Sequence, residues 1–346
     1  MTMSKGMNVA IDSCVFFRMI EFNNFINAYG EKYLDQLLTL KNQELKSLKD
    51  ELLVTLTPEF FQKYSNLTFE EQIEKYKNYA TNLESNCLKA MDYNMKMANN
   101  AQNESDKLFY IQKYQENYNA LVGLTTYDSV AENLRKINDY KMQKETIEVG
   151  KIFQKALNGE YNLFVNFIAF DEILNHTNRR VNPHWLYYDL SEVQSLTDNL
   201  VCVISTDSEK IKNAIEQLAL DYRTGNGLPN DKPMSEDINS VDDFGDSKIA
   251  AFSNLSGMIL ITLNGKDFIF DKGGKRGNDN IRRHLNYTNS KYDFTTDASV
   301  YSTTELLTGK IKEPQMESKI LKYVNYSNDF GSLPCNNEET NEVQMY

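Results

Sequence analysis

Long hydrophobic runs are absent from this sequence. No stretch reaches the roughly 18 consecutive apolar residues that are needed to cross a bilayer, so no transmembrane helix is expected. The first residues also lack the apolar core of a signal peptide. We therefore expect a cytoplasmic protein that has no membrane partner.

Cysteine and histidine are scarce as well. The chain has four cysteines and three histidines, and no two cysteines form a C-x-x-C pair. Reduced thiols in the cytosol are the simplest interpretation of such scattered cysteines. Without cysteine pairs or clustered histidines, a zinc site is not expected. Any bound metal would then be a hard cation held by oxygen atoms, such as Mg²⁺ or Mn²⁺.

Positive charge is also in deficit. The chain has 37 Lys and Arg residues against 49 Asp and Glu residues, a net charge of −12. This balance excludes a polycation that coats nucleic acid or an anionic membrane. It does not exclude an enzyme of nucleic acid, because acids can gather in a site with basic residues at its rim. At 346 residues, 41% of them hydrophobic, the chain is long enough for two domains with real cores.

The chain does contain a strand-and-helix pattern at both of its ends. The apolar run Val9–Ile11 stops at Asp12, and apolar residues at helical spacing follow it to about residue 30. Residues 161–310 return to this alternation. Alternating strands and helices predict an α/β fold with a mostly parallel central sheet flanked by helices. The further predicted strands cover residues 161–167, 200–204 and 258–262.

The residues between these parts have the pattern of helices. Residues 31–160 carry leucines at helical spacing and few strand-forming clusters. Thr57-Pro58 has the pattern of a helix start, and Thr68 with Glu71 has that of a capping box. Further helix signals are a predicted cap at Ser105 and a helical pattern from Asp128 to Leu157 that ends near Gly159.

These patterns divide the chain into three parts. Residues 1–30 and 161–310 are predicted to form one discontinuous α/β core. Residues 31–160 are predicted to be an all-α insertion, about the size of a domain. Residues 311–346 form a C-terminal segment. We expect a partly disordered tail there, because the chain after Lys322 has acidic residues and no basic ones.

Acidic residues stand at the ends of the predicted strands. Asp12 ends the first strand, Glu172 lies on the helix after the second, and Asp246 opens the helix that precedes the strand at 258–262. Asp267 follows that strand. Ligands of open α/β sheets bind at the carboxyl ends of the strands, and clustered carboxylates that repel one another are most simply held by a divalent cation. Each acid taken singly also has a structural explanation as a helix cap, a turn residue or a surface residue.

Four segments, in this order along the chain, share the pattern of one family. NVAIDSCVFF (8–17) is similar to the opening strand and first acid of that family, and FIAFDEILNH (167–176) to its second acid. A further segment is DDFGDSKIAAFSNLSGMILITLNGKDFIF (242–270). It is similar to the part of that family in which an acid is followed by a helix, a strand and the motif Thr-x-Asn-x-x-Asp-Phe. Residues 200–223 fit the segment between the family's second and third acids. The family thus resembled is that of the PIN-domain metal-dependent nucleases. The helical insertion has no role assigned in that family.

The resemblance implies a PIN-like core with a set of acids that are both catalytic and metal-binding. These acids are Asp12, Glu172, Asp246 and Asp267. Thr262 and Asn264 would be polar supports on the substrate side of the site.

Two of these assignments have neighbours that could replace them. Asp171 is the alternative to Glu172, although the family favours Glu at the second position. Asp242 or Asp243 is the alternative to Asp246, which has the family's spacing to the helix that follows.

Basic residues follow the last acid. Residues 265–292 carry seven Lys and Arg against three Asp, which suits contact with phosphates. A solvated charged loop is the alternative interpretation. The predicted substrate-binding cations are Lys275 and Arg276 in this run and Arg179 and Arg180 after the second acid. Arg282 also belongs to the basic run.

The resemblance implies a nuclease that hydrolyses phosphodiester bonds with Mg²⁺ or Mn²⁺, with RNA favoured over DNA. A toxin or defence role fits the family, although no residue of the sequence indicates it. Two alternatives stay open. One is a structure-specific DNA nuclease of the wider PIN-like group. The other is a PIN-like scaffold without activity that binds partners through its helical insertion. The insertion is also where we expect a homodimer contact or an inhibitory protein partner.

Overall fold

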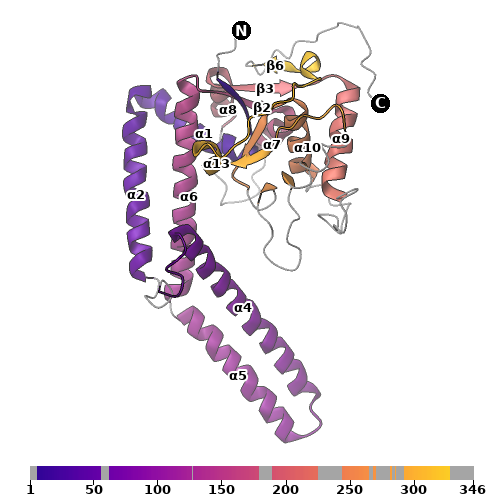
Figure 1. Cartoon of the computed structure of the whole chain (residues 1–346). Coiled ribbons are helices and arrows are strands. Elements are labelled where there is room, and N and C mark those ends of the chain that lie inside the picture. The colour runs from indigo at the N-terminus through magenta and orange to yellow at the C-terminus, as the bar shows by residue number, and fades with distance from the viewer. Residues whose placement is uncertain are drawn as a thin grey trace. The chain divides into compact units, whose positions relative to one another are not determined.

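The computed structural model divides the chain into two compact units (Figure 1). Unit 1 comprises Met1–Leu38 and Glu145–Tyr346, and unit 2 comprises Thr39–Lys144. The residues that the structure describes are 6–55, 62–126, 128–178, 189–224, 244–264, 268–269, 281–282, 285 and 292–327.

Unit 1 is built on a sheet whose six strands have the order β5-β4-β1-β2-β3-β6. All neighbouring strands are parallel except β3 and β6, which are antiparallel. The expectation of an α/β fold with a mostly parallel sheet is confirmed. The strands are β1 (Met7–Ile11), β2 (Tyr161–Asn166), β3 (Val201–Ser205), β4 (Ile259–Thr262), β5 (Val300–Ser302) and β6 (Asn325–Ser327).

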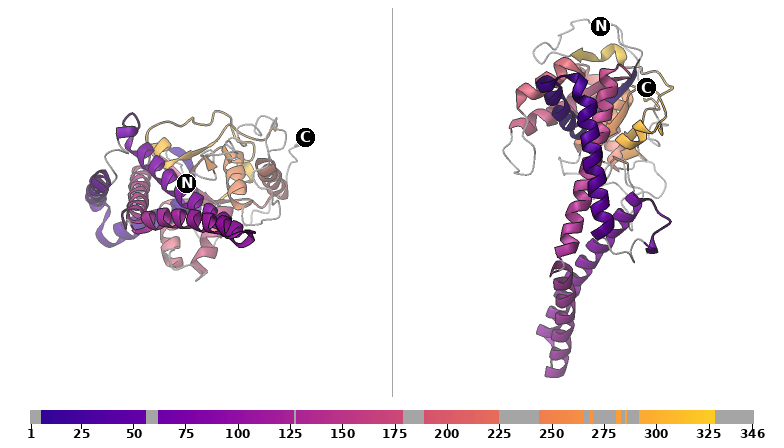
Figure 2. Two further views of the ribbon diagram at one scale, coloured as in Figure 1. Left: turned by 90° about the horizontal axis from the view of Figure 1, so that it is seen from below. Right: turned by 90° about the vertical axis from the view of Figure 1, so that its left-hand side faces the viewer.

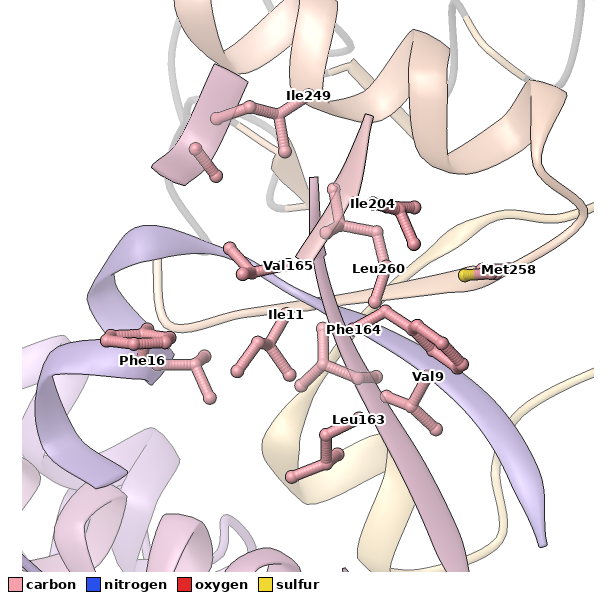
Figure 3. Packing of buried hydrophobic residues seen from close by; sticks show 14 of the residues in the cluster. Val9, Ile11, Phe16, Leu163, Phe164, Val165, Ile204, Ile249, Met258 and Leu260 are labelled. Carbon is pink, nitrogen blue, oxygen red and sulfur yellow. The ribbon is translucent and has the colours of Figure 1, made fainter. Parts of the chain in front are cut away.

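The central strands are apolar over consecutive residues because both faces of the sheet are covered. Val9 and Ile11 of β1 and Leu260 of β4 are at most 1% exposed. Figure 3 shows these side chains together with Phe164 of β2 and Phe16 of the following helix. Continuous burial of this kind is typical of parallel strands between two layers of helices.

Helices connect the strands and flank the sheet (Figure 1). Two of them begin in capping boxes that the sequence analysis overlooked, Asp189 with Glu192 and Ser302 with Glu305. The helices that lie wholly within unit 1 are α1 (Ser13–Tyr29), α7 (Phe167–Asn178), α8 (Leu190–Asn199), α9 (Glu209–Thr224), α10 (Phe244–Leu255) and α13 (Thr303–Leu307), with short 3-10 turns at Glu31–Tyr33 and Leu321–Tyr323.

The described part of the C-terminal segment belongs to this sheet. In the segment 311–346, β6 pairs with β3, and Ile320 and Val324 are buried in the core of unit 1. Residues 328–346 lie outside the described residues.

The helical part of the chain contains four long helices. A capping box of Thr68 and Glu71 starts α4, as predicted. The predicted cap at Ser105 is wrong, because α5 already begins at Glu104 and Asn103 Oδ1 accepts the Asp106 N–H at 2.8 Å. Thr57-Pro58 lies outside the described residues. The helices are α2 (Leu34–Thr55), α4 (Phe69–Asn100), α5 (Glu104–Thr126) and α6 (Asp128–Leu157).

The boundary between the units runs through α2 and α6. Leu34 and Leu38 of α2 and Val149 and Phe153 of α6 are buried in the core of unit 1. The ends of these helices therefore belong with the sheet, and the predicted insertion at 31–160 is longer than unit 2. The core of unit 2 consists of Leu52, Ile73, Tyr76, Ile137 and Tyr140.

Candidate functional site

The order of the strands places a topological switch point between β1 and β4 of unit 1, at the edge of the sheet where the strands have their carboxyl ends. β1 stands between β2 and β4, so the chain runs outward through β2 and β3 on one side and through β4 and β5 on the other. The connections leaving β1 and β4 diverge at their carboxyl ends, which is where open α/β sheets bind ligands. Asp12 directly follows β1, and Thr262 is the last residue of β4.

Asp12 is a buried carboxylate, 3% exposed, with three kinds of donor around it. Its Oδ1 accepts the N–H of Ser13 at 2.7 Å, as expected of the residue that caps α1. Its Oδ2 accepts the hydroxyl of Thr262 at 2.8 Å and the thiol of Cys14 at 3.0 Å. Asp12 is thus a helix cap, and it is also a carboxylate held rigidly at the edge where the sheet diverges.

Glu172 approaches Asp12 from α7. The Ser13 hydroxyl donates to Glu172 Oε2 at 3.1 Å, which ties α7 to the first turn of α1. Burial, and then the negative charge of Asp12, raise the pKa of Glu172 to about 7, and the Ser13 hydrogen bond opposes this shift. The alternative acid, Asp171, is exposed and has no hydrogen bond to these residues. The structure therefore brings Glu172, and not Asp171, to the first acid.

Asp246 joins this group through β4. Asn264 donates its side-chain N–H to Asp246 Oδ2 at 3.2 Å and its backbone N–H to Thr262 Oγ1 at 2.9 Å. Asp246 is the third residue of α10 and does not cap it. Gly245 lies against Glu172, because a Cβ on Gly245 would stand 2.5 Å from Glu172 Oε1.

The donor set suits a hard cation in chemistry, although the described residues do not form a complete site. Among them, no three His, Cys, Asp or Glu side chains form a group that could hold a metal ion. The pair of Asp12 and Glu172 nevertheless carries the repulsion that a cation would relieve, since Asp12 helps to raise the pKa of Glu172. No hydrogen bond from the described residues reaches Glu172 Oε1, which leaves one carboxylate oxygen as a candidate ligand.

Several predicted site residues lie outside the described residues. Arg282 is described, and its guanidinium pairs with the Glu305 carboxylate at 3.0 and 2.5 Å and with the Val300 carbonyl at 2.7 Å. Its place in the predicted basic rim is therefore wrong, because its donors hold α13 and β5. The residues outside the described part are Asp267, Lys275, Arg276, Arg179, Arg180, Asp242 and Asp243.

Sequence reasoning missed the small residues that arrange these acids. Ser13 bridges Asp12 and Glu172, and nothing in a lone serine signals that role. Cys14 is a half-buried cysteine whose Sγ accepts the Leu263 N–H at 3.3 Å. Burial, and then the charge of Asp12, raise the pKa of Cys14 well above its ordinary value, so the thiol stays protonated and donates to Asp12.

Comparisons with known proteins add no relative to this picture. No family model matches the chain, and neither curated proteins nor solved structures give a match. A search of the described residues finds no helix that is both long and apolar enough to span a bilayer.

Proposed function

We propose that the chain is a divalent-cation-dependent nuclease, an endoribonuclease of the PIN-domain type, whose site is the group of acids at the carboxyl ends of β1 and β4. The observation that carries the proposal is that Ser13 donates hydrogen bonds to the carboxylates of both Asp12 and Glu172, which brings the two acids together at this edge, where burial and the charge of Asp12 raise the pKa of Glu172 to about 7. A fold gains no stability from two carboxylates that repel each other, and such perturbed pairs gather at functional sites. The preference for RNA rests on the resemblance in sequence alone.

Asp12 and Glu172 are the proposed ligands, with Asp246 close by and Asp267 as the fourth predicted acid. A bound Mg²⁺ or Mn²⁺ would neutralise charge on the phosphodiester under attack and lower the pKa of water. Glu172 also has a pKa at which a carboxyl group takes up or releases a proton near neutral pH, as a general acid or base does.

The neighbouring residues orient these acids. Thr262 and Cys14 both donate to Asp12 Oδ2, which leaves that carboxylate one orientation. The Ser13 hydroxyl does the same for Glu172, and Asn264 for Asp246. Hydrogen bonds that aim carboxylates are a regular feature of metal sites.

A cleavage assay with three variants tests the proposal. Labelled RNA and DNA are offered with Mg²⁺ or Mn²⁺, with and without EDTA. RNA cleavage should require the cation and should be lost in Asp12→Asn and Glu172→Gln. Asp171→Asn is the matched control, because it removes an exposed carboxylate from the neighbouring position of the same helix and should leave activity unchanged.

Binding of Mn²⁺ by calorimetry provides a measurement that does not depend on activity, and it should weaken in both site variants. Thermal unfolding of each variant checks that the fold is kept. Cleavage that survives EDTA or either site substitution overturns the proposal. Cleavage of DNA alone indicates the structure-specific DNA nuclease instead. A folded protein that binds neither nucleic acid nor Mn²⁺ indicates the scaffold without activity.

A further inference from the structure

In the hairpin of α4 and α5 in unit 2, the side chains of α5 are buried less than those of α4. The two helices lie side by side (Figures 1 and 2) and are joined by a link of three residues. Between Glu104 and Leu121, no side chain of α5 is buried. The buried cluster of unit 2 includes no residue of α5 and none of α4 beyond Tyr76.

The half-buried side chains of α5 form one seam that faces α4. Tyr110, Tyr114, Asn117 and Leu121 recur at steps of three and four residues and are only partly exposed. On the partner helix, Cys87, Asn94 and Ala98 are buried at similar spacing. The contact between the two helices is thus made of polar and small residues as well as apolar ones.

A second seam on α5 is apolar and exposed. Leu108, Ile111 and Tyr118 are 62%, 44% and 43% exposed and lie at heptad positions on one side of the helix. On α4, Leu88 and Met95 are 50% and 42% exposed and stand two helical turns apart.

These two seams lie on the same side of the hairpin. On each helix, the exposed apolar residues lie about a quarter turn from the residues that contact the other helix, in the direction of increasing residue number. Because the two helices run antiparallel, these quarter turns bring both sets to the same side of the hairpin. Half-buried Met91 stands between Leu88 and Met95 on α4 and makes the surface continuous. We call this surface of Leu88, Met91, Met95, Leu108, Ile111 and Tyr118 the hairpin face.

We propose that the hairpin face pairs with the same face of a second copy of the chain, so that two hairpins form an antiparallel four-helix bundle. Five of its side chains expose on the order of 90 Å² each, roughly 450 Å² in sum. Roughly 60% of the area of a typical interface is apolar, so this apolar area corresponds to a total interface of about 750 Å² per copy. A stable dimer buries about 800 Å² per copy. Burial of that apolar area provides the driving force for the pairing.

The charge of the hairpin favours its own copy over a charged partner. Residues 86–120 carry four lysines and four acids, a net charge of zero in a chain of −12. Two pairs already neutralise one another within a helix, Lys96 with Asp92 at 2.7 Å and Lys113 with Glu116 at 2.7 Å. Two copies therefore meet here without net repulsion, and no excess charge calls for an acidic or basic partner.

The oligomeric state of the full chain tests this proposal independently of any nuclease activity. Light scattering after size exclusion should give the mass of two chains of 40.0 kDa each at micromolar concentration. Leu108→Lys combined with Ile111→Lys should raise the dissociation constant at least about 30-fold, because both copies would bury unpaired charge. Phe109→Lys combined with Ala120→Lys is the matched control, because it adds the same two charges at exposed positions on the opposite side of the same helix and should leave the dimer intact.

Leu88→Lys tests the α4 side of the same face and should also weaken the dimer, which guards against misfolding of the α5 variant. Circular dichroism verifies the helical content of each protein. A wild-type chain that is a monomer at these concentrations overturns the proposal. So does a dimer that persists in both folded face variants, because its contact must then lie elsewhere.

Discussion

Thr262 Oγ1 donates a hydrogen bond of 2.8 Å to Asp12 Oδ2, so the last residue of β4 holds the carboxylate that follows β1. The same hydroxyl accepts the backbone N–H of Asn264 at 2.9 Å. One threonine therefore links two parallel strands and both acids, Asp12 directly and Asp246 through Asn264. The stability of this edge and the geometry of the proposed site depend on the same atom.

Replacing Thr262 by valine should destabilise unit 1. Val has nearly the same shape but leaves the Asn264 N–H without its acceptor and Asp12 without one donor, a loss of about 1–3 kcal/mol. Thr262→Ser keeps the hydroxyl and should be the more stable of the two, although it loses a buried methyl group. Urea unfolding at constant pH gives the comparison, and equal stability of the two variants would rule out a role for the hydroxyl.

The raised pKa of Glu172 should make stability depend on pH. The folded protein holds a proton on this group up to pH of about 7, whereas the unfolded chain releases it near 4.5. Between these values the folded state binds more protons than the unfolded state, so the free energy of unfolding falls as pH rises from about 4.5 to about 7. Glu172→Gln lacks this term, and its stability relative to wild type should rise through that window and level off above it.

Mg²⁺ should offset the same repulsion. Above the pKa of Glu172, adding Mg²⁺ should raise the melting temperature of the wild-type protein more than that of Glu172→Gln. Asp171→Asn is the control, because it removes a neighbouring carboxylate of the same helix that is exposed and makes no hydrogen bond to the site residues. It should keep the full response to Mg²⁺. An equal response in wild type and Glu172→Gln would remove Glu172 from the proposed ligands.

Gly245→Ala should displace the Glu172 side chain while leaving the stability of the fold almost unchanged. A Cβ there would stand 2.5 Å from Glu172 Oε1, and the end of that flexible side chain can swing away. Alanine also favours the helix by up to about 1 kcal/mol over glycine, so the stability should change little. Cleavage should fall at least about tenfold as Glu172 leaves its place. In a Glu172→Ala background, where cleavage is already lost, the close contact with Glu172 Oε1 is absent and the same substitution should raise the melting temperature by more than it does in wild type. An equal change of melting temperature in the two backgrounds would contradict this account.

The thiols of Cys14 and Cys202 should be slow to alkylate in the folded protein. Burial raises the pKa of Cys202 to about 11, and burial with the charge of Asp12 raises that of Cys14 well above 9.0. A shift of about two units lowers the thiolate fraction about 100-fold, so both should react at least that much more slowly at pH 8 than in urea. Mass spectrometry of iodoacetamide-treated protein measures each site. Rates in the folded protein equal to those in urea would show that neither thiol is held as described.

Elements with a strong local signal could be predicted from the sequence. The run Val9–Ile11 forms β1, and the apolar residues after Asp12 form α1. The capping box of Thr68 and Glu71 starts α4. In each case the signal is contained within a few consecutive residues, because hydrophobic periodicity and capping are local properties of the chain.

Elements whose stability comes from distant partners were missed. β6 spans only Asn325–Ser327, and its strand conformation depends on pairing with β3. β5 (Val300–Ser302) is equally short and pairs with β4. A strand of three residues has no periodicity to detect, so only the sheet reveals it.

The sequence by itself determined the class of fold, the order of most strands and helices, and the acids worth examining. Only the tertiary structure decided that Glu172 and not Asp171 meets Asp12, that Ser13 bridges them, and that Arg282 is committed to Glu305. Consecutive residues decide secondary structure. A site depends instead on which distant side chains the packing brings together, here those of Asp12, Glu172 and Thr262. The pKa of Glu172 belongs to that second kind of property, because neither burial nor a neighbouring charge exists before the chain has folded.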